Sequence, residues 1–191
     1  IFVSMSSMDI YWYGQACFKL KGKNAVVILD PFDPDFTGLR LPKDFEADIV
    51  LKTHDHKDHN NVNGVSGSPL IFGGPGEYEV KGVVITGIPS FHDNSEGKER
   101  GLNTIYNITI DGLNVVHLGD LGQASLTEEQ VQSINADVLL IPVGSIFGIS
   151  IFTFLINIFS FITPPKTAIN LAYLLLILVG IFIDKLNIKS S

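Results

Sequence analysis

Three histidines and two aspartates lie within residues 53–59, whose sequence is Thr-His-Asp-His-Lys-Asp-His. Imidazole and carboxylate are common protein ligands of zinc, manganese and iron. The pattern His-x-His-x-Asp-His supplies enough of them to begin two adjacent metal sites. This run therefore predicts a metal centre in a loop.

The two remaining histidines of the chain each stand near a carboxylate. His92 precedes Asp93, and His117 begins the run His-Leu-Gly-Asp that ends at Asp120. A hydrolase with two metal ions needs about six to eight ligand atoms, gathered from the ends of separate strands. His92 and Asp120 are therefore expected to complete the ligand set.

The expected ligands are His54, His56, Asp58, His59, His92 and Asp120. We expect one metal on His54, His56 and His92. The second is expected on Asp58 and His59, with Asp120 as the bridge. Two cations roughly 3.5 to 4 Å apart lower the pKa of a bound water toward neutrality, so that the hydroxide can attack carbon or phosphorus. Asp58 is also the candidate catalytic residue, as a proton acceptor.

Three more polar residues are expected to support the ligands rather than bind metal. Asp55 has the wrong alternation to face the same metals, so it is expected to order the loop or support a ligand. Asp93 has a similar expected role. His117 is expected to end a strand and to hydrogen-bond to a ligand or a backbone carbonyl.

These residues need strands to position them. A predicted strand over residues 47–53 delivers the histidine run to the loop after its carboxyl end, where ligands of α/β proteins commonly lie. Further strands are predicted from apolar runs between turn residues, over 10–14, 17–20, 25–30, 70–72, 83–88, 104–110, 114–117 and 138–142.

Two other local signals are a helix start and a glycine-rich run. Ser125 is the predicted N-cap of a helix, with Glu128 as its capping-box partner and Val131 and Ile134 on the apolar face. Residues 73–78 predict a turn between strands, because no Lys-Ser/Thr follows as a phosphate-binding loop requires.

Composition limits the partners of the chain. The 191 residues suit one domain, and residues 1–145 hold 10 Lys and Arg against 19 Asp and Glu. Such an acidic domain repels phosphate backbones, so we expect a small-molecule substrate and no nucleic acid. The single cysteine, Cys17, excludes an internal disulfide and indicates a reducing compartment, so the domain is expected to be cytoplasmic.

The composition changes near Ser145. Residues 146–163 and 167–183 contain no charged side chain, and Pro164 and Pro165 lie between them. Three interpretations compete for this tail of two predicted helices: a membrane-associated hairpin through 146–183, an apolar completion of the core, or a C-terminus altered by a reading-frame error. The predicted division is therefore a hydrolase domain over 8–145 and a hydrophobic tail over 146–191.

With these residues in view, the chain resembles the metallo-β-lactamase superfamily, in particular its ascorbate-6-phosphate lactonase-like branch. The matching segments are 12–18, 29–31, 53–59, 76–80, 91–93, 117–122 and 137–144. The resemblance implies an αββα sandwich of the α/β (α+β) class, with a binuclear zinc or manganese site at one edge of the paired sheets. It implies the same six ligands.

The chain departs from this family after residue 144. Members continue with a helix and a strand ending in a Pro-Met-His-Tyr-like motif, whose histidine completes the second metal site. No histidine follows His117 here. The sandwich is therefore expected to be incomplete at its C-terminal end.

Two functions from different classes remain open. The first is a metal-dependent hydrolase that uses a metal-bound hydroxide on a small ester, lactone or phosphoester. The second is a metal-binding or membrane-tethered remnant, catalytically impaired because the last histidine ligand is missing.

Overall fold

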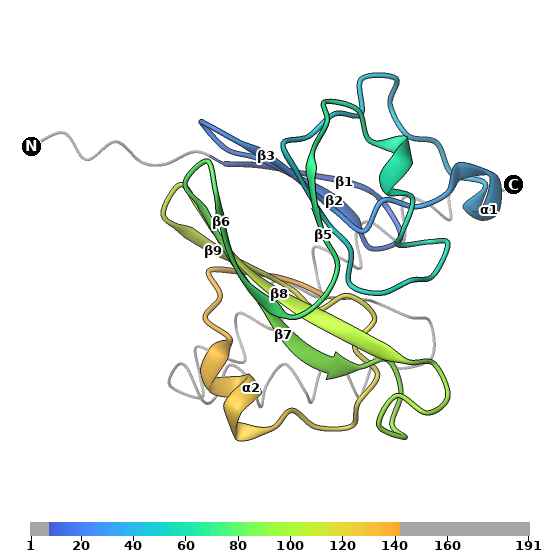
Figure 1. Cartoon of the computed structure of the whole chain (residues 1–191), viewed down its shortest axis with the longest axis vertical. Coiled ribbons are helices and arrows are strands. Elements are labelled where there is room, and N and C mark those ends of the chain that lie inside the picture. The colour runs from blue at the N-terminus through green and yellow to red at the C-terminus, as the bar shows by residue number, and fades with distance from the viewer. Residues whose placement is uncertain (1–7, 142–191) are drawn as a thin grey trace, which may run out of the picture. The chain divides into compact units, whose positions relative to one another are not determined.

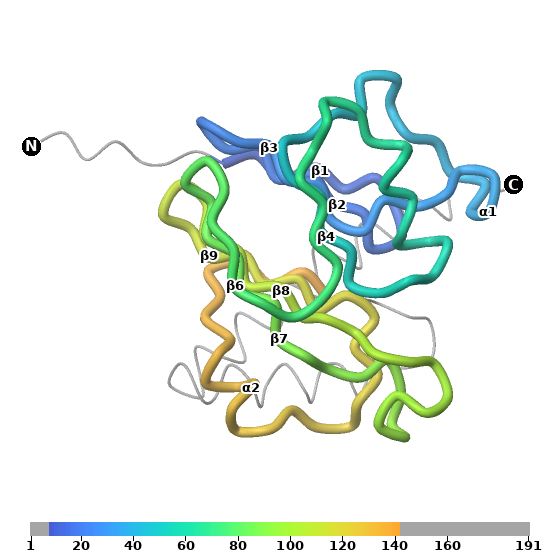
Figure 2. The backbone as a smooth tube through the Cα atoms, in the orientation of Figure 1, coloured from blue at the N-terminus to red at the C-terminus, as the bar shows by residue number. Residues whose placement is uncertain are grey.

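The computed structural model describes residues 8–141, which form two five-stranded sheets (Figure 1). The first sheet consists of β1 (Asp9–Gly14), β2 (Cys17–Lys21), β3 (Val26–Leu29), β4 (Ile49–Leu51) and β5 (Leu70–Phe72), in that order. The second has the order β10-β9-β8-β7-β6, made of β6 (Gly76–Val80), β7 (Val83–Phe91), β8 (Leu102–Ile110), β9 (Leu113–His117) and β10 (Val138–Leu140). The tube in Figure 2 shows the chain finishing one sheet before it begins the other.

The paired sheets confirm the predicted αββα class. Within residues 8–141 the helices are short: α1 (Pro34–Thr37), the 3-10 turn η1 (Val62–Gly64) and α2 (Glu128–Ser133). None of the helices in this described part is long and apolar enough to cross a membrane. The predicted tail over 146–191 lies outside the described residues.

The main core lies between the two sheets. Alternating positions of β3 and β4 face it, with Leu29 and Leu51 fully buried beside Ile108 of β8. The opposite face of the first sheet is covered by the connections that flank β4, where Ile28 and Val50 share a second cluster with neighbours that include Phe32, Phe45 and Val65. Both faces of β3 and β4 are therefore apolar, as is typical of a buried parallel pair.

Strand direction brings the polar segments together. β3 and β4 are parallel, so the residues that follow them, Asp30 and the loop from Lys52 onward, leave the same edge of the first sheet. β7 and β9 are each antiparallel to β8, so they also end at one edge, at Phe91 and His117. The backbone N–H of Thr104 in β8 donates to the carbonyl of Thr53 at 3.0 Å, which joins the two edges.

The predicted start of α2 is wrong by two residues. Thr127, not Ser125, is the N-cap, and Gln130 completes the capping box in place of Glu128. Both pairs fit the same sequence pattern. Gln130 is selected because its side chain is buried and its Nε2 donates to the carbonyl of Pro89 at 2.7 Å, a tertiary contact that the local pattern does not contain.

The glycine-rich run is only partly a turn. Residues 73–75 connect the sheets, but β6 begins at Gly76 and pairs with β7 through residue 80. The backbone of residues 74 and 75 passes within about 3 Å of where a side chain at Gly87 would begin, so glycine is required there for the close approach.

Candidate metal centre

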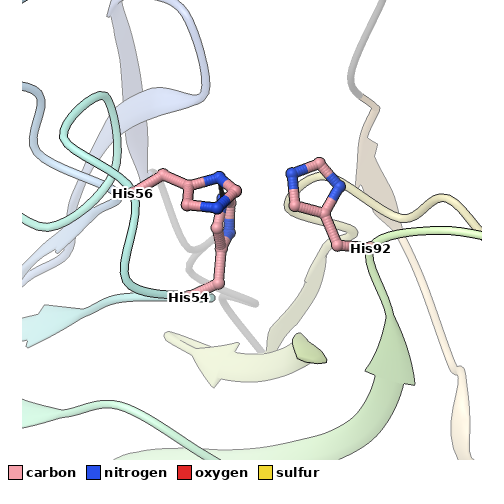
Figure 3. Close-up of side chains that lie close together, drawn as sticks. All are labelled: His54, His56 and His92. Atoms are coloured by element: carbon pink, nitrogen blue, oxygen red, sulfur yellow. Dashed lines mark hydrogen bonds between the residues drawn. The ribbon is translucent and has the colours of Figure 1, made fainter. Parts of the chain in front are cut away.

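Three histidine rings converge from the two sheets. His54 and His56 lie in the loop after β4, and His92 follows β7; one ring nitrogen from each lies within 4.8 Å of the others. Figure 3 shows the ring of His92, carried by the segment after β7, pointing toward the rings of His54 and His56, which lie in the loop after β4. The ring centroid of His54 is 4.5 Å from that of His56 and 4.7 Å from that of His92. This set is the one expected from the sequence for the first metal.

A second group shares His54 with the first. Its ligand atoms come from His54, His59 and Asp120, again within 4.8 Å of one another. Oδ2 of Asp120 is 3.4 Å from Nε2 of His59 and 3.5 Å from Nε2 of His92. Asp120 belongs to the second group and also lies close to His92 of the first, where a bridging carboxylate would be needed.

The two other acids of the histidine loop are placed differently. Oδ2 of Asp58 is 3.7 Å from Nε2 of His59, and its side chain is 30% exposed, so it borders the centre without joining either close group. Asp55 points into solvent, 76% exposed, and pairs with Lys52. Of the two, only Asp58 is close enough to a candidate ligand to take part in chemistry.

A buried carboxylate outside the predicted set of site residues lies beside the centre. Asp30 is fully buried at the end of β3. Its Oδ1 accepts the backbone N–H of Thr53 at 2.7 Å, and its Oδ2 accepts the Thr53 hydroxyl at 2.9 Å and Nε2–H of His117 at 2.8 Å. Nδ1 of His59 lies 3.0 Å from the same Oδ2, without the alignment of a regular hydrogen bond.

This carboxylate assigns the orientation of two candidate ligands. An ionised Asp30 only accepts hydrogen bonds, so the Thr53 hydroxyl must donate to it and accept from Nδ1–H of His54, 2.9 Å away. The lone pair of His54 is then on Nε2, which faces Nδ1 of His56 at 3.1 Å. The same carboxylate favours a proton on Nδ1 of His59, which leaves Nε2 to face Asp120. Carboxylates in this position commonly fix the ring orientation of metal-binding histidines.

The protonation of the centre follows from its charges. Burial, together with the charge of His59, lowers the pKa of His54 to about 4, so this imidazole is neutral near pH 7. Burial also lowers the pKa of His59, but the adjacent carboxylates of Asp120 and Asp30 outweigh it and raise that pKa to about 10. Although burial opposes it, the hydrogen bond from His117 and the nearby His59 keep the pKa of Asp30 far below its ordinary value. Without metal, a proton on His59 thus neutralises part of the carboxylate charge.

The supporting roles predicted for His117 and Asp93 correspond to defined contacts. His117, 2% exposed, meets a carboxylate, Asp30, rather than a ligand or a backbone carbonyl. Asp93 accepts four backbone N–H groups of the next loop, from Ser95, Gly97, Glu99 and Arg100. The bonds from Arg100 and the other amides lower the pKa of Asp93 to about 2. This carboxylate orders the loop immediately after His92.

The donor set suits a borderline divalent cation. Neutral imidazoles and carboxylates are the ligands that zinc and manganese accept in proteins. Nε2 of His54 faces a nitrogen of His56 only 3.1 Å away, and one cation between two lone pairs satisfies both. His54, His56 and His92 fit one cation, and His59 with Asp120 fits another beside it once the proton on His59 is released.

The position of Asp30, at the end of a predicted apolar strand, is a sign in the sequence that this carboxylate has partners. A carboxylate directly after an apolar strand must have partners, because burying an unpaired charge is costly. The partner Thr53, however, is 23 residues away and His117 is 87 residues away. Only the pairing of β3 with β4 and the docking of the sheets bring them together.

Comparisons with known proteins agree with this geometry. A family profile described as a β-lactamase superfamily domain matches residues 9–174. A "UPF0173 metal-dependent hydrolase" of Methanoculleus marisnigri is 33% identical over 165 residues, which cover 73% of this chain and 70% of that protein. A second protein of the same description, from Thermoplasma acidophilum, is 28% identical over 169 residues, covering 73% of this chain and 72% of its own length.

A solved structure shares the same architecture. It comes from Thermotoga maritima, is described as a candidate Zn-dependent hydrolase of the metallo-β-lactamase superfamily, and is 37% identical with a TM-score of 0.60. The match covers 74% of this chain and 64% of the Thermotoga chain. The chain thus spans somewhat less than two thirds of that protein.

Proposed function

Since the chain belongs to the metallo-β-lactamase superfamily of metal-dependent hydrolases, we propose that it binds up to two zinc or manganese ions and hydrolyses a small ester, lactone or phosphoester. The observation that carries this proposal is the pair of overlapping groups, His54–His56–His92 and His54–His59–Asp120, built from both sheets. The narrower resemblance to ascorbate-6-phosphate lactonase stays a prediction.

The residues of the centre have separate tasks in this proposal. His54, His56 and His92 would hold the first cation, and His59 with Asp120 and the bordering Asp58 the second. Bound cations supply Lewis-acid chemistry: they lower the pKa of water and polarise a substrate oxygen. Asp30 holds the rings of His54 and His59 in the required orientation through Thr53 and its own Oδ2.

Asp58 is the proposed proton acceptor. Its carboxylate borders the second group at 3.7 Å from Nε2 of His59 and is 30% exposed, so it can reach both the centre and solvent. A positioned general base contributes typically 10² to 10⁴-fold to the rate. Asp58 can take the proton from an attacking water at Oδ1 or Oδ2 and release it to bulk solvent.

Metal analysis and hydrolysis assays test the proposal together. Purified chain, stripped and reloaded with zinc or manganese, should bind more than one equivalent and should hydrolyse p-nitrophenyl esters or bis(p-nitrophenyl) phosphate. Asp58→Asn should lower kcat at least about 100-fold. Asp55→Asn is the matched control, since it removes the same charge from the same loop at an exposed position. At most one metal per chain, with no turnover after reloading, would instead support the metal-binding remnant.

A further inference from the structure

The loop between β7 and β8 carries an arginine that the proposed chemistry does not use. Four cationic side chains lie in the loops that hold the histidines: Lys52, Lys57, Lys98 and Arg100. Three are engaged, because Lys52 pairs with Asp55, Lys57 lies 5.9 Å over the ring of Phe36, and Lys98 pairs with Glu96. Arg100 has no ion pair within residues 8–141.

The backbone under Arg100 is held firmly beside the centre. Its own N–H donates to Oδ2 of Asp93 at 2.7 Å, and the next residue, Gly101, accepts the N–H of His92 at 3.0 Å. The side chain of Arg100 is exposed. A backbone fixed to the loop after His92, and a guanidinium without an ion pair in the described part of the chain, together make Arg100 a candidate binding position.

An apolar side chain accompanies this cation. Leu102, at the start of β8, is 69% exposed. It lies on the same face of the strand as Thr104 and Tyr106, and Tyr106 belongs to the core between the sheets. Leu102 therefore extends that inner face beyond the core, two residues from the N–H that bonds Thr53.

We propose that Arg100 and Leu102 select the substrate: an anion, carboxylate or phosphate, that carries an apolar group. The proposal rests on the proposed hydrolytic function and adds its substrate class. Arginine forms paired hydrogen bonds with both oxyanions, which lysine cannot reproduce. The domain as a whole is acidic, with 10 cationic against 19 acidic side chains in residues 1–145, so it repels anions except where an unneutralised cation faces them.

Binding of small probes tests this without requiring turnover. Calorimetric titration of the zinc-loaded protein with phenyl phosphate, phenylacetate and neutral phenylacetamide should show about tenfold weaker binding of both anions by Arg100→Gln, with an intermediate loss for Arg100→Lys. Lys98→Gln is the matched control, because it removes the same charge from the same loop; its affinities should stay within twofold. Whichever of the two anions binds wild type more tightly identifies the preferred oxyanion.

A second pair of variants tests the apolar contact. Leu102→Ser should weaken phenyl phosphate several-fold while leaving inorganic phosphate unchanged. Leu70→Ser, at another exposed leucine on the edge strand β5, should change neither. Equal losses of anion binding in Arg100→Gln and Lys98→Gln, or no loss in either, would overturn the assignment.

Hydrolysis separates this proposal from the function on which it rests. With p-nitrophenyl hydrogen glutarate and neutral p-nitrophenyl valerate, Arg100→Gln should raise KM about tenfold for the anionic ester only. Wild type that hydrolyses both esters equally, with Arg100→Gln unchanged, would refute the substrate class and keep the hydrolase. Wild type that hydrolyses neither would refute the hydrolase, and the binding titrations would still decide the role of Arg100.

Discussion

Replacing Asp30 with asparagine would remove one negative charge from beneath the metal centre and little else. Asparagine has nearly the same size, and it tolerates the left-handed backbone found at this position, where φ is 44°. The buried carboxylate now accepts from Thr53 N, Thr53 Oγ1 and His117 Nε2. An amide retains one acceptor oxygen but turns N–H groups toward at least one of these donors.

The expected loss follows from these contacts. A hydrogen bond to a charged group contributes about 1.5–3 kcal/mol, and breaking a buried charge pair costs about 3–5 kcal/mol. We therefore expect Asp30→Asn to lower the free energy of unfolding of the metal-free protein by about 3–5 kcal/mol at pH 7. Zinc affinity should fall about 10 to 100-fold, because His54 and His59 lose the group that orients them.

The pH dependence gives an internal check. The pKa of Asp30 is lowered in the folded protein, so its contribution is present above the unfolded-state pKa of about 3.9 and is lost as pH falls through the folded-state pKa. The difference between wild type and Asp30→Asn should therefore be full at pH 7 and should shrink below about pH 4.

The assays are urea unfolding followed by circular dichroism and zinc competition with a chromophoric chelator. Asp111→Asn is the matched control, because Asp111 also has a left-handed backbone, with φ of 50°, and its Oδ2 accepts the backbone N–H of Lys23 at 2.8 Å. That variant should lose at most about 1.5 kcal/mol and keep its zinc affinity. Zinc affinity of Asp30→Asn within twofold of wild type, or a stability loss no larger than that of Asp111→Asn, would refute the reasoning.

In metal-free protein the free energy of unfolding should fall as pH rises from about 6.5 toward 10. The cause is His59, which loses its stabilising proton over this range because the adjacent carboxylates raise its pKa to about 10 despite burial. Urea titrations should show this fall in wild type, and the same fall in His59→Gln would contradict the assignment. His92→Ala should lower zinc affinity more than about 100-fold in chelator competition with an unchanged far-UV spectrum, since it removes a ligand rather than a ligand's support. Tyr106→Phe should lower the free energy of unfolding by about 1–3 kcal/mol. The tyrosine hydroxyl that it removes accepts the N–H of Gly74 at 3.0 Å and donates to the carbonyl of Lys52 at 3.1 Å. A loss under about 0.5 kcal/mol would show that water replaces these bonds.

Local patterns in the sequence were sufficient for most strands. The apolar run over 70–72 predicts β5 with its observed bounds, and the run over 47–53 before the histidine loop predicts β4, which spans Ile49–Leu51. These segments are short apolar runs between turn residues, and such runs predict strands whether the strand is buried, as β4 is, or lies at the sheet edge, as β5 does. The start of α2 failed because two capping patterns overlap, and only a contact with Pro89 decides between them.

In the candidate site, too, local sequence patterns predict some residues, and tertiary contacts decide the others. His54, His56 and His59 could be predicted as candidate ligands because they stand close together in one loop. The approach of His92 and Asp120 could be expected only as a hypothesis, since it depends on the docking of two sheets. The roles of Asp30 and Thr53 could not be found by motif, because their importance comes from contacts across 23 and 87 residues of sequence.

The order of the strands gives the metal centre a role in assembly. Strands β1 to β5 come from one uninterrupted stretch of chain and β6 to β10 from the next, with residues 73–75 between them. The first stretch supplies His54, His56 and His59, and the second supplies His92 and Asp120. A cation bound by both stretches adds its binding free energy to their association. Two fragments divided within residues 73–75 would therefore associate more tightly with the cation bound than after a chelator has removed it.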